Sequence, residues 1–381
     1  MGVLIHSVSD FLRLRRTRPQ PADVHLEAVM GWLCRAQDAT PDGGVARMYH
    51  IKTGWGASYP ETTGYIIPTF IEFSRMVERP AFLQRALRMA DWEIEVQMPS
   101  GAVQGGTVAD PPSPAIFNTG QVIFGWLAAH RASGDRRYLE AAVRAGNFLL
   151  AQQDPDGAWR RNLSAFCSPV PKPDSYIYNI RTAWALMLLA QATGDDHYRE
   201  AGEANLTHVL ARARPNGWLP DNCLNDPIRP LLHTIAYTTQ GMLEAGRLSG
   251  SAEAQEVVVR ANEHLAACFE RYGQMHGRYD ERRTPSARWR CLTGEAQTAV
   301  VWFRLAQLTG ERRWFQRAVA LTEQVKRTQA LSGDPNIVGG IKGSQPIYGW
   351  YGKYQYLNWA AKFYADALML EAGHAAAGTS G

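Results

Sequence analysis

The residues best suited to acid–base chemistry in this sequence lie at the starts of six similar apolar segments. Each segment opens with polar or glycine residues and continues as an apolar run, as in FNTGQVIFGWLAAH. In two other copies, Glu61 lies four positions before Tyr65, and His233 lies four positions before Tyr237. Glu295 falls at the position equivalent to Tyr65 in a further copy. Four residues make about one helical turn, so these side chains share a face near the helix starts. All five are candidate catalytic residues.

One chemistry that fits these residues is glycoside hydrolysis. A glycosidase needs two carboxyl groups roughly 5 to 10 Å apart, one as acid and the other as nucleophile or base. Glu61 and Glu295 are the carboxylates best placed by sequence to face the axis of a helical ring. Each also has a structural alternative. For Glu61 it is a place at the helix N-terminus, which stabilises a carboxylate; for Glu295 it is a salt bridge with Arg181 or Arg290.

A second chemistry is proton exchange on a uronic acid. Helix N-termini aimed into one mouth, with basic residues nearby, favour an anionic substrate. Tyr65, Tyr237 or His233 would exchange the proton α to the uronate carboxylate, while Arg181 neutralises the carboxylate and its enolate. The result is a lyase if the 4-substituent leaves, or a C5-epimerase if the proton returns to the other face. The alternative for His233 is a capping or packing role.

Substrate-binding candidates are polar residues at the helix starts and aromatic residues of the intervening loops. Aromatic faces pack against the C–H faces of sugar rings while polar groups take the hydroxyls. The alternative is that the aromatic side chains fill the loop interiors. The candidates are Trp55, Tyr59, Asn118, Gln121, Tyr178, Arg181, Asp221, Arg288, Tyr356 and Asn358.

Two kinds of helix must position these residues. The inner segments are apolar nearly all round, which predicts burial on all sides. They alternate with charged amphipathic segments, several of which follow a [ST]-G-[DE]-x-x-[YW] turn, as in SGDRRY and TGERRW. Repetition at about 55 residues predicts an all-α fold, an (α/α)6 barrel of six hairpins. The inner helices are expected at 61–73, 117–130, 178–190, 233–245, 291–303 and 356–369, and the first outer helix at 24–37.

Loop lengths indicate which end of the barrel is active. The links from outer to inner helices are long, as at 38–61 and 328–355, whereas the inner-to-outer links are tight turns. Long loops in compact domains are usually functional. The sequence predicts an N-terminal leader segment at 1–23, a barrel domain at 24–374 and a disordered tail at 375–381.

Composition narrows the class of protein. The chain has 381 residues, a net charge of +4 without basic tracts, and five scattered cysteines without CxxC spacing. Nucleic-acid binding, a disulfide framework and a zinc motif are therefore not indicated. No metal or other cofactor is expected, although the sequence leaves open a calcium ion bound by carboxylates of the loops. The absence of a long apolar run or signal-peptide pattern predicts a cytoplasmic protein without stable membrane insertion. Oligomeric state is not predicted.

Three motifs resemble a known family. GWGASYPETTGYIIPTF, FNTGQVIFGW and SGDRRYLEAA resemble VpsJ-like proteins of bacterial exopolysaccharide biosynthesis, and the helix alternation is similar to the six-hairpin glycosidase-like superfamily. The resemblance implies the toroid fold and a glycan substrate. It does not decide whether the reaction is hydrolysis, elimination or epimerisation. A non-catalytic glycan-binding or assembly factor is the alternative function. A terpenoid cyclase on the same toroid needs an Asp-rich acid or metal motif, and the adjacent pair Asp195 and Asp196 lies in a repeat turn instead.

Overall fold

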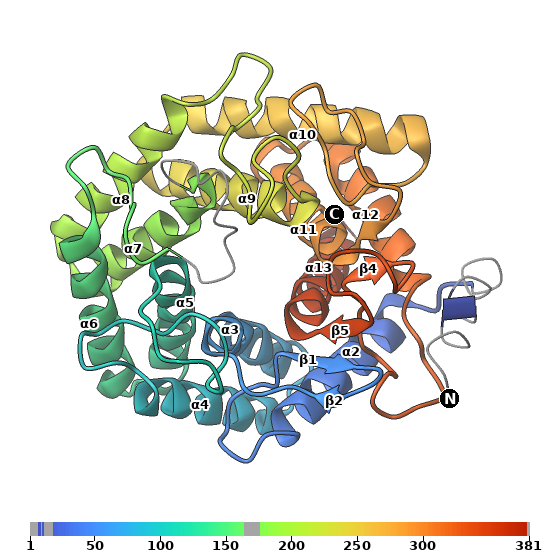
Figure 1. Ribbon diagram of the computed structural model, residues 1–381, viewed down its shortest axis with the longest axis horizontal. Helices are drawn as coiled ribbons and strands as arrows, with labels where there is room; N and C mark the ends of the chain where they lie inside the picture. The colour runs from blue at the N-terminus through green and yellow to red at the C-terminus, as the bar shows by residue number, and fades with distance from the viewer. Residues whose placement is uncertain (1–6, 9, 11–17, 164–175, 379–381) are drawn as a thin grey trace.

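The inner helices form a closed ring. The computed structural model describes residues 7, 8, 10, 18–163 and 176–378. Each inner helix packs against the next along the chain, and the last packs against the first, which closes the ring around a central axis (Figure 1). This confirms the predicted (α/α)6 barrel. The inner helices are α3 (Pro60–Met76), α5 (Ile116–Ser133), α7 (Ile180–Thr193), α9 (Leu232–Ser249), α11 (Leu292–Thr309) and α13 (Asn358–Gly378).

An outer ring of helices surrounds the inner one. Each even-numbered helix from α4 to α12 packs on the inner helix that precedes it in the chain, whereas α2 packs on α13. The first helix of the barrel therefore completes the last hairpin. The outer helices are α2 (Ala22–Asp38), α4 (Pro80–Glu95), α6 (Arg136–Gln152), α8 (Asp196–Leu210), α10 (Ala252–Tyr272) and α12 (Arg312–Lys326).

Glycines let the inner helices approach each other closely. A Cβ at Gly125 would lie 2.3 Å from the carbonyl oxygen of Gly64, and a Cβ at Gly64 would lie 2.6 Å from Cα of Val122. Such distances are far below van der Waals contact, so α3 and α5 meet backbone to backbone. Most residues of both helices are buried, as the sequence predicted, and the exposed ones lie near their C-terminal ends.

The tight inner-to-outer turns depend on a left-handed glycine. In four turns the residue after the inner helix is a glycine with φ between 70° and 76°, and its N–H donates back to a carbonyl of the last turn. Glycine adopts this conformation without a Cβ penalty. The four are Gly134, Gly194, Gly250 and Gly310.

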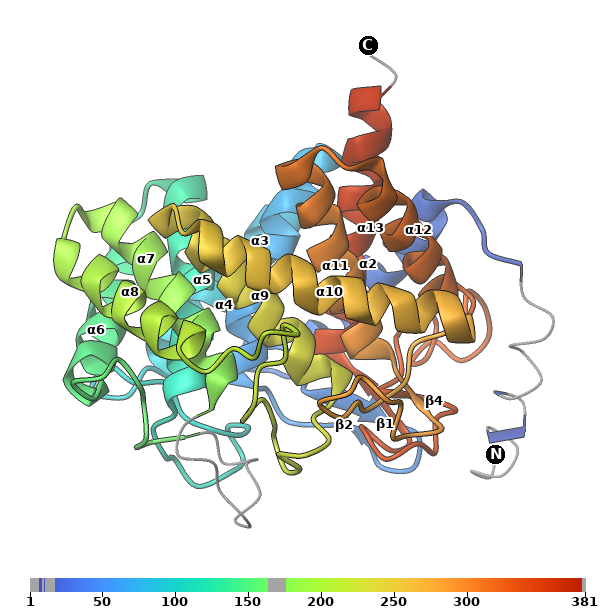
Figure 2. The same cartoon turned by 90° about the horizontal axis from the view of Figure 1, so that it is seen from above.

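The long loops gather at the opposite end of the barrel (Figure 2). They carry short strands that the sequence did not predict. One antiparallel sheet has the order β2 (Gly54–Trp55), β1 (Met48–His50), β5 (Gln355–Leu357), and another pairs β3 (Arg290–Cys291) with β4 (Ser344–Gln345). The first sheet joins the first long loop to the last, so residues distant in sequence lie side by side.

Some predicted boundaries need correction. α2 begins at Ala22, and the short helix η1 (Ile177–Asn179) precedes α7, so Tyr178 lies before the inner helix proper. α13 continues to Gly378, past the predicted start of a tail at 375. Of the predicted leader and tail, residues 1–6, 9, 11–17 and 379–381 lie outside the described residues, as do loop residues 164–175. Among the described helices, none is long and apolar enough to cross a bilayer.

Candidate active site

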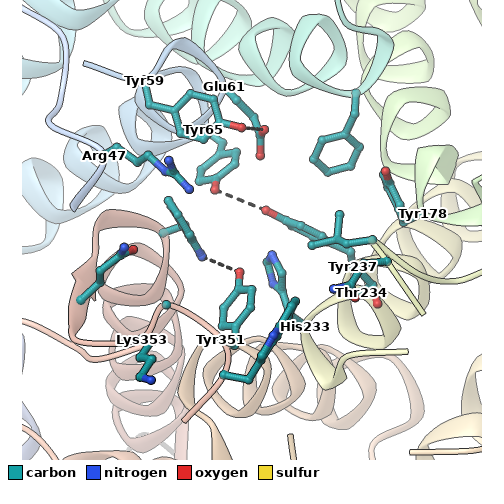
Figure 3. Close-up of a pocket in the computed structure, with 17 residues that line it drawn as sticks. Arg47, Tyr59, Glu61, Tyr65, Tyr178, His233, Thr234, Tyr237, Tyr351 and Lys353 are labelled. Atoms are coloured by element: carbon teal, nitrogen blue, oxygen red, sulfur yellow. Dashed lines mark hydrogen bonds between the residues drawn. The ribbon is translucent and has the colours of Figure 1, made fainter. Parts of the chain in front are cut away.

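A cavity of about 370 Å³ opens among the long loops, at the N-terminal ends of the inner helices. Its wall comes from elements spread over the whole chain, as the proposed convergence of helix starts requires. Figure 3 shows Glu61 and His233 on opposite sides, with Tyr65 and Tyr237 between them. The lining residues are Arg47, Tyr59, Glu61, Tyr65, Phe117, Tyr178, Leu224, Asn225, His233, Thr234, Tyr237, Trp350, Tyr351, Gly352, Lys353, Gln355 and Trp359.

Glu61 is a buried carboxyl group in the first turn of α3. It is 7% exposed, and Oε2 accepts a hydrogen bond from the hydroxyl of Tyr59. Burial raises its pKa to about 7, against the opposing influence of that hydrogen bond and of the charges of Arg181 and Arg47. A carboxyl group with a pKa near neutrality can donate or accept a proton at working pH.

His233 is a buried imidazole in the first turn of α9. Its Nδ1 lies 2.7 Å from Oε1 of Gln297 on α11. An amide oxygen only accepts, so Nδ1 carries the proton and Nε2 keeps a lone pair for a group in the cavity. Burial lowers the pKa of His233 to about 4; the bond to Gln297 opposes this shift, and the charge of Arg181 adds to it. The imidazole is therefore neutral at pH 7.

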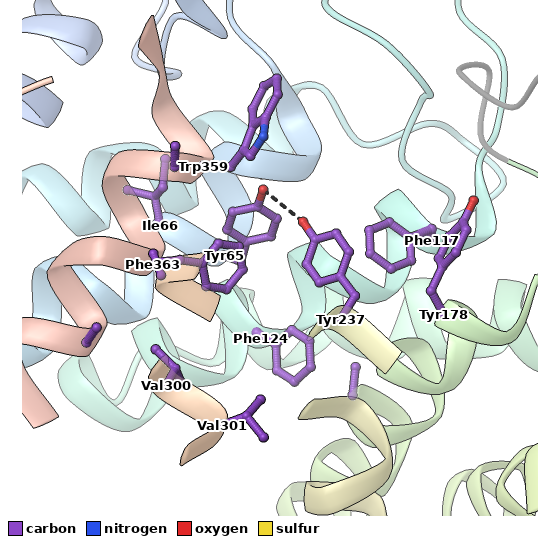
Figure 4. Close-up of a cluster of buried hydrophobic side chains, with 14 of the residues drawn as sticks. Tyr65, Ile66, Phe117, Phe124, Tyr178, Tyr237, Val300, Val301, Trp359 and Phe363 are labelled. Atoms are coloured by element: carbon purple, nitrogen blue, oxygen red, sulfur yellow. Dashed lines mark hydrogen bonds between the residues drawn. The ribbon is translucent and has the colours of Figure 1, made fainter. Parts of the chain in front are cut away.

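Tyr65 and Tyr237 meet at the centre of the site. Their hydroxyl groups are 3.3 Å apart, and Figure 4 shows the two rings pointing toward one another, with Phe117 and Tyr178 beside Tyr237. Burial raises the pKa of both hydroxyls. Both hydroxyl groups are therefore protonated at neutral pH, and the Tyr237 hydroxyl donates to that of Tyr65.

Arg181 lies outside the cavity wall. It is 2% exposed, its Nε donates to Gln121 Oε1 at 2.9 Å and its Nη1 to Gln240 Oε1 at 2.5 Å. Its guanidinium stacks 4.9 Å from the ring centre of Tyr237. The expectation that Arg181 contacts a substrate carboxylate is thus corrected: its charge acts on the cavity from behind Tyr237. The guanidinium that does line the cavity is that of Arg47.

Glu295 does not face the cavity. Its carboxylate is fully buried and paired with Arg290, whose Nε donates to Oε1 at 2.8 Å. The structural alternative from the sequence therefore describes this residue, and the two-carboxylate arrangement expected of Glu61 and Glu295 is absent from the cavity wall. Of the residues at the position equivalent to Tyr65, Tyr65 and Tyr237 line the cavity, whereas Gln121, Arg181 and Glu295 do not.

Several predicted substrate-binding residues hold the loops together instead of lining the cavity. Trp55 donates to Asn336 Oδ1 at 3.1 Å and packs on Trp32. Asn118 and Asn358 are buried and donate to backbone carbonyls of neighbouring loops, those of Gln104 and Ala46. Polar side chains at helix starts are needed here to satisfy loop backbone groups.

The other predicted binding residues are also placed away from the wall. Gln121 is fully buried and accepts from Arg181. Asp221 has a left-handed backbone with φ 57°, Arg288 is exposed on the α10–α11 loop, and Tyr356 pairs with Tyr49 in the sheet. Of the binding candidates, the structure brings Tyr59 and Tyr178 into the cavity.

Three kinds of cavity residue were not among the candidate site residues. Arg47 precedes β1, in a loop whose fold depends on pairing with β5 at the other end of the chain. Tyr351 and Lys353 come from the aromatic stretch GWYGKYQY, whose composition indicates a loop but does not place each residue. Trp359 directly follows Asn358 on α13 and donates to the hydroxyl of Tyr351 at 2.8 Å. Within the described ranges, no group of three or more His, Cys, Asp and Glu side chains is placed to hold a metal ion.

The fold is shared with sugar-processing enzymes. No protein-family model matches this sequence, and no curated protein matches it either. Among solved structures, the chain is similar to an unsaturated glucuronyl hydrolase specific for heparin (14% identity, TM-score 0.72, covering 92% of this chain and 97% of that one). It is also similar to a sugar epimerase from a ruminal bacterium (15% identity, TM-score 0.73, covering 92% of this chain and 97% of that one). A third similar structure is the cellobiose 2-epimerase from Bacillus thermoamylovorans (12% identity, TM-score 0.72, covering 91% of this chain and 97% of that one). At these identities the likeness shows a shared fold, the (α/α)6 toroid, and nothing finer.

Proposed function

We propose that this chain is a carbohydrate-active enzyme that transfers a proton on a uronate residue of an oligo- or polysaccharide. The observation that supports this best is the pairing of Glu61 and His233 across one cavity. Burial has reversed the usual order of their pKa values, to about 7 for Glu61 and about 4 for His233. Titratable groups separated in this way are the usual sign of an acid and a base with different tasks.

The charge around the cavity favours an anionic sugar. Arg47 and Lys353 line the wall, and Arg181 contributes its charge from behind Tyr237. Several inner helices direct their N-terminal N–H groups toward the same mouth, which adds positive potential. The aromatic side chains of Phe117 and Trp359 offer apolar faces for a sugar ring.

The residues can perform proton exchange without a second carboxylate. Nε2 of His233 accepts the proton from the carbon α to the uronate carboxylate, and Arg47 stabilises the enolate that forms. Protonated Glu61 then returns a proton to the opposite face, which gives the C5 epimer. If instead its proton goes to the departing 4-oxygen, the product is an unsaturated uronate. Tyr65 and Tyr237 donate hydrogen bonds to the developing oxyanion.

Hydrolysis is the second candidate, because the chain is similar in structure to unsaturated glucuronyl hydrolases. In this reaction Glu61 donates its proton and His233 activates water. A role in exopolysaccharide biosynthesis, as the VpsJ-like motifs suggest, and a cytoplasmic location belong to the same proposal and stay predictions of the sequence.

The test is incubation with a panel of uronate-containing glycans in deuterated water. New ultraviolet absorbance of an unsaturated uronate indicates elimination, deuterium at C5 without cleavage indicates epimerisation, and new reducing ends without either indicate hydrolysis. Glu61→Gln and His233→Ala should each abolish the turnover observed. Glycan binding without any turnover across the panel contradicts the proposal and favours a binding or assembly factor.

A further inference from the structure

An exposed tryptophan stands at the mouth of the cavity. Trp350 is 56% exposed, although it also contributes to the cavity wall. The guanidinium of Arg278 lies 4.8 Å from its ring centre. Large aromatic side chains are costly to leave in water, so a tryptophan supported on one side and open on the other suggests a stacking surface.

The guanidinium that supports Trp350 is fixed. Nη1 of Arg278 donates to the carbonyl of Arg229 at 2.6 Å, and Nη2 donates to Oδ1 of Asn225 at 2.9 Å. Asn225 itself lines the cavity. Arg278 therefore links the α8–α9 and α10–α11 loops beneath the tryptophan, and its planar group stays stacked on the ring.

The loop that carries Trp350 is also fixed. Gly349 donates its N–H to the Pro346 carbonyl at 2.8 Å, and Tyr354 donates to the Ile347 carbonyl at 2.8 Å. A Cβ at Gly349 would lie 2.5 Å from Cβ of Ser344, so the loop is pressed against β4. Binding to a pre-ordered ring costs little conformational entropy.

We propose that Trp350, supported by Arg278, forms an outer subsite that stacks the sugar adjacent to the reacting uronate. This rests on the proposed function and names its substrate class: an anionic oligo- or polysaccharide chain, not a free sugar. The cavity volume of about 370 Å³ is near the lower end of the range of about 300–1,000 Å³ for small-molecule sites. Further sugars of a chain must therefore lie over the mouth, where Trp350 is placed.

Charge near the outer subsite suits such a chain. Arg278 lies against the Trp350 ring, and exposed Lys353 lines the same cavity. The carbonyl of exposed Arg229 accepts from Arg278, and its side chain is paired with Asp226 at 3.0 Å. The balance of these groups is positive, so carboxylates on neighbouring sugars are attracted. Because these side chains are in contact with solvent, added salt should weaken this contribution.

The test compares Trp350→Ala with Tyr348→Ala. Tyr348 is 48% exposed on the same loop but does not line the cavity, so it is a matched control. Affinity is measured by titration with glucuronic acid and with hyaluronan and alginate tetrasaccharides. We expect the ratio of tetrasaccharide to monosaccharide affinity to fall about tenfold or more in Trp350→Ala, a common loss for a truncated aromatic anchor. Tyr348→Ala should keep the ratio, and Trp350→Phe should restore most of it.

The outcomes separate this inference from the proposed function. If tetrasaccharides bind the wild-type chain no more tightly than the monosaccharide, or if Trp350→Ala leaves the ratio unchanged, the outer subsite is wrong even where turnover is found. If the ratio falls as expected but the glycan panel shows no turnover, the outer subsite stands and the proposed reaction fails.

Discussion

At the scale of single residues, the same physical cause acts on Glu61 and His233 in opposite chemical directions. Burial disfavours the charged form of each, so it raises the pKa of a carboxyl group and lowers that of an imidazole. The partners differ: a tyrosine hydroxyl donates to Glu61, whereas the amide oxygen of Gln297 accepts from His233. Both groups are consequently neutral over a common pH range.

That range predicts the pH dependence of turnover. If protonated Glu61 is the acid and neutral His233 the base, kcat/KM should be bell-shaped, with limbs near the pKa values of about 4 and about 7. Activity rises with pH as His233 loses its proton and falls as Glu61 loses its own. The profile is measured on the substrate found with the glycan panel. A rate that instead increases through pH 7 would assign Glu61 the role of base.

Gln297 is expected to position His233 and to set its protonation state. Gln297→Glu replaces the neutral acceptor with a carboxylate 2.7 Å from Nδ1 in the parent, which should raise the pKa of the imidazole and move the acidic limb upward. Gln297→Leu removes an acceptor that raises this pKa, so the limb should move downward. NMR titration of the His233 ring together with the kcat/KM profile measures both shifts. Equal rate losses with an unshifted limb would indicate only a packing role.

At the scale of helices, the ring depends on the small residues where inner helices cross. Gly125→Ala places a methyl group 2.3 Å from the Gly64 carbonyl oxygen, so α3 and α5 must separate. We expect a loss of about 1–3 kcal/mol in the free energy of unfolding, as for other overpacked interiors. Gly373→Ala is the matched control, because a Cβ on this glycine of α13 would meet nothing within 4 Å, and the variant should gain up to about 1 kcal/mol. Denaturant unfolding gives both values, and a neutral Gly125→Ala would contradict this account.

The helices could be predicted from the sequence because their signals are local. The apolar runs of the inner helices and turns such as Gly134 and Gly194 predict elements from a few neighbouring residues. The strands could not, since β1 is held by β5 from the far end of the chain. Glu61 lies in the mouth, as the sequence predicted, whereas Arg47 was missed because its loop depends on that distant pairing. The ion pair of Glu295 with Arg290 could be offered only as an alternative, because the sequence does not show which way either side chain points.

At the scale of the whole molecule, global stability should distinguish the two inner-helix carboxylates. Glu295 is paired with buried Arg290, so Glu295→Gln leaves a buried charge without its partner. Removing one partner of a buried pair costs about 3–5 kcal/mol. Glu61 lies in a different environment, where folding favours the protonated form. Replacing Glu61 with Gln should therefore increase the free energy of unfolding relative to the wild type, at a pH high enough to ionise the Glu61 carboxyl group.

The difference in free energy of unfolding between the wild type and Glu61→Gln should depend on pH. Folding raises the pKa of Glu61 from 4.5 to about 7, so the folded state binds more protons than the unfolded state between these values. The contribution of Glu61 to the free energy of unfolding of the wild type is fully present below pH 4.5 and is lost as the pH rises through 7. Glu61→Gln has no such dependence, so its stability relative to the wild type should increase by about 3 kcal/mol across this window. His233 titrates in both proteins and cancels in the comparison. Urea unfolding of the two proteins from pH 4 to pH 8 measures the difference, and a difference that stays constant with pH would show that folding does not raise the pKa of Glu61.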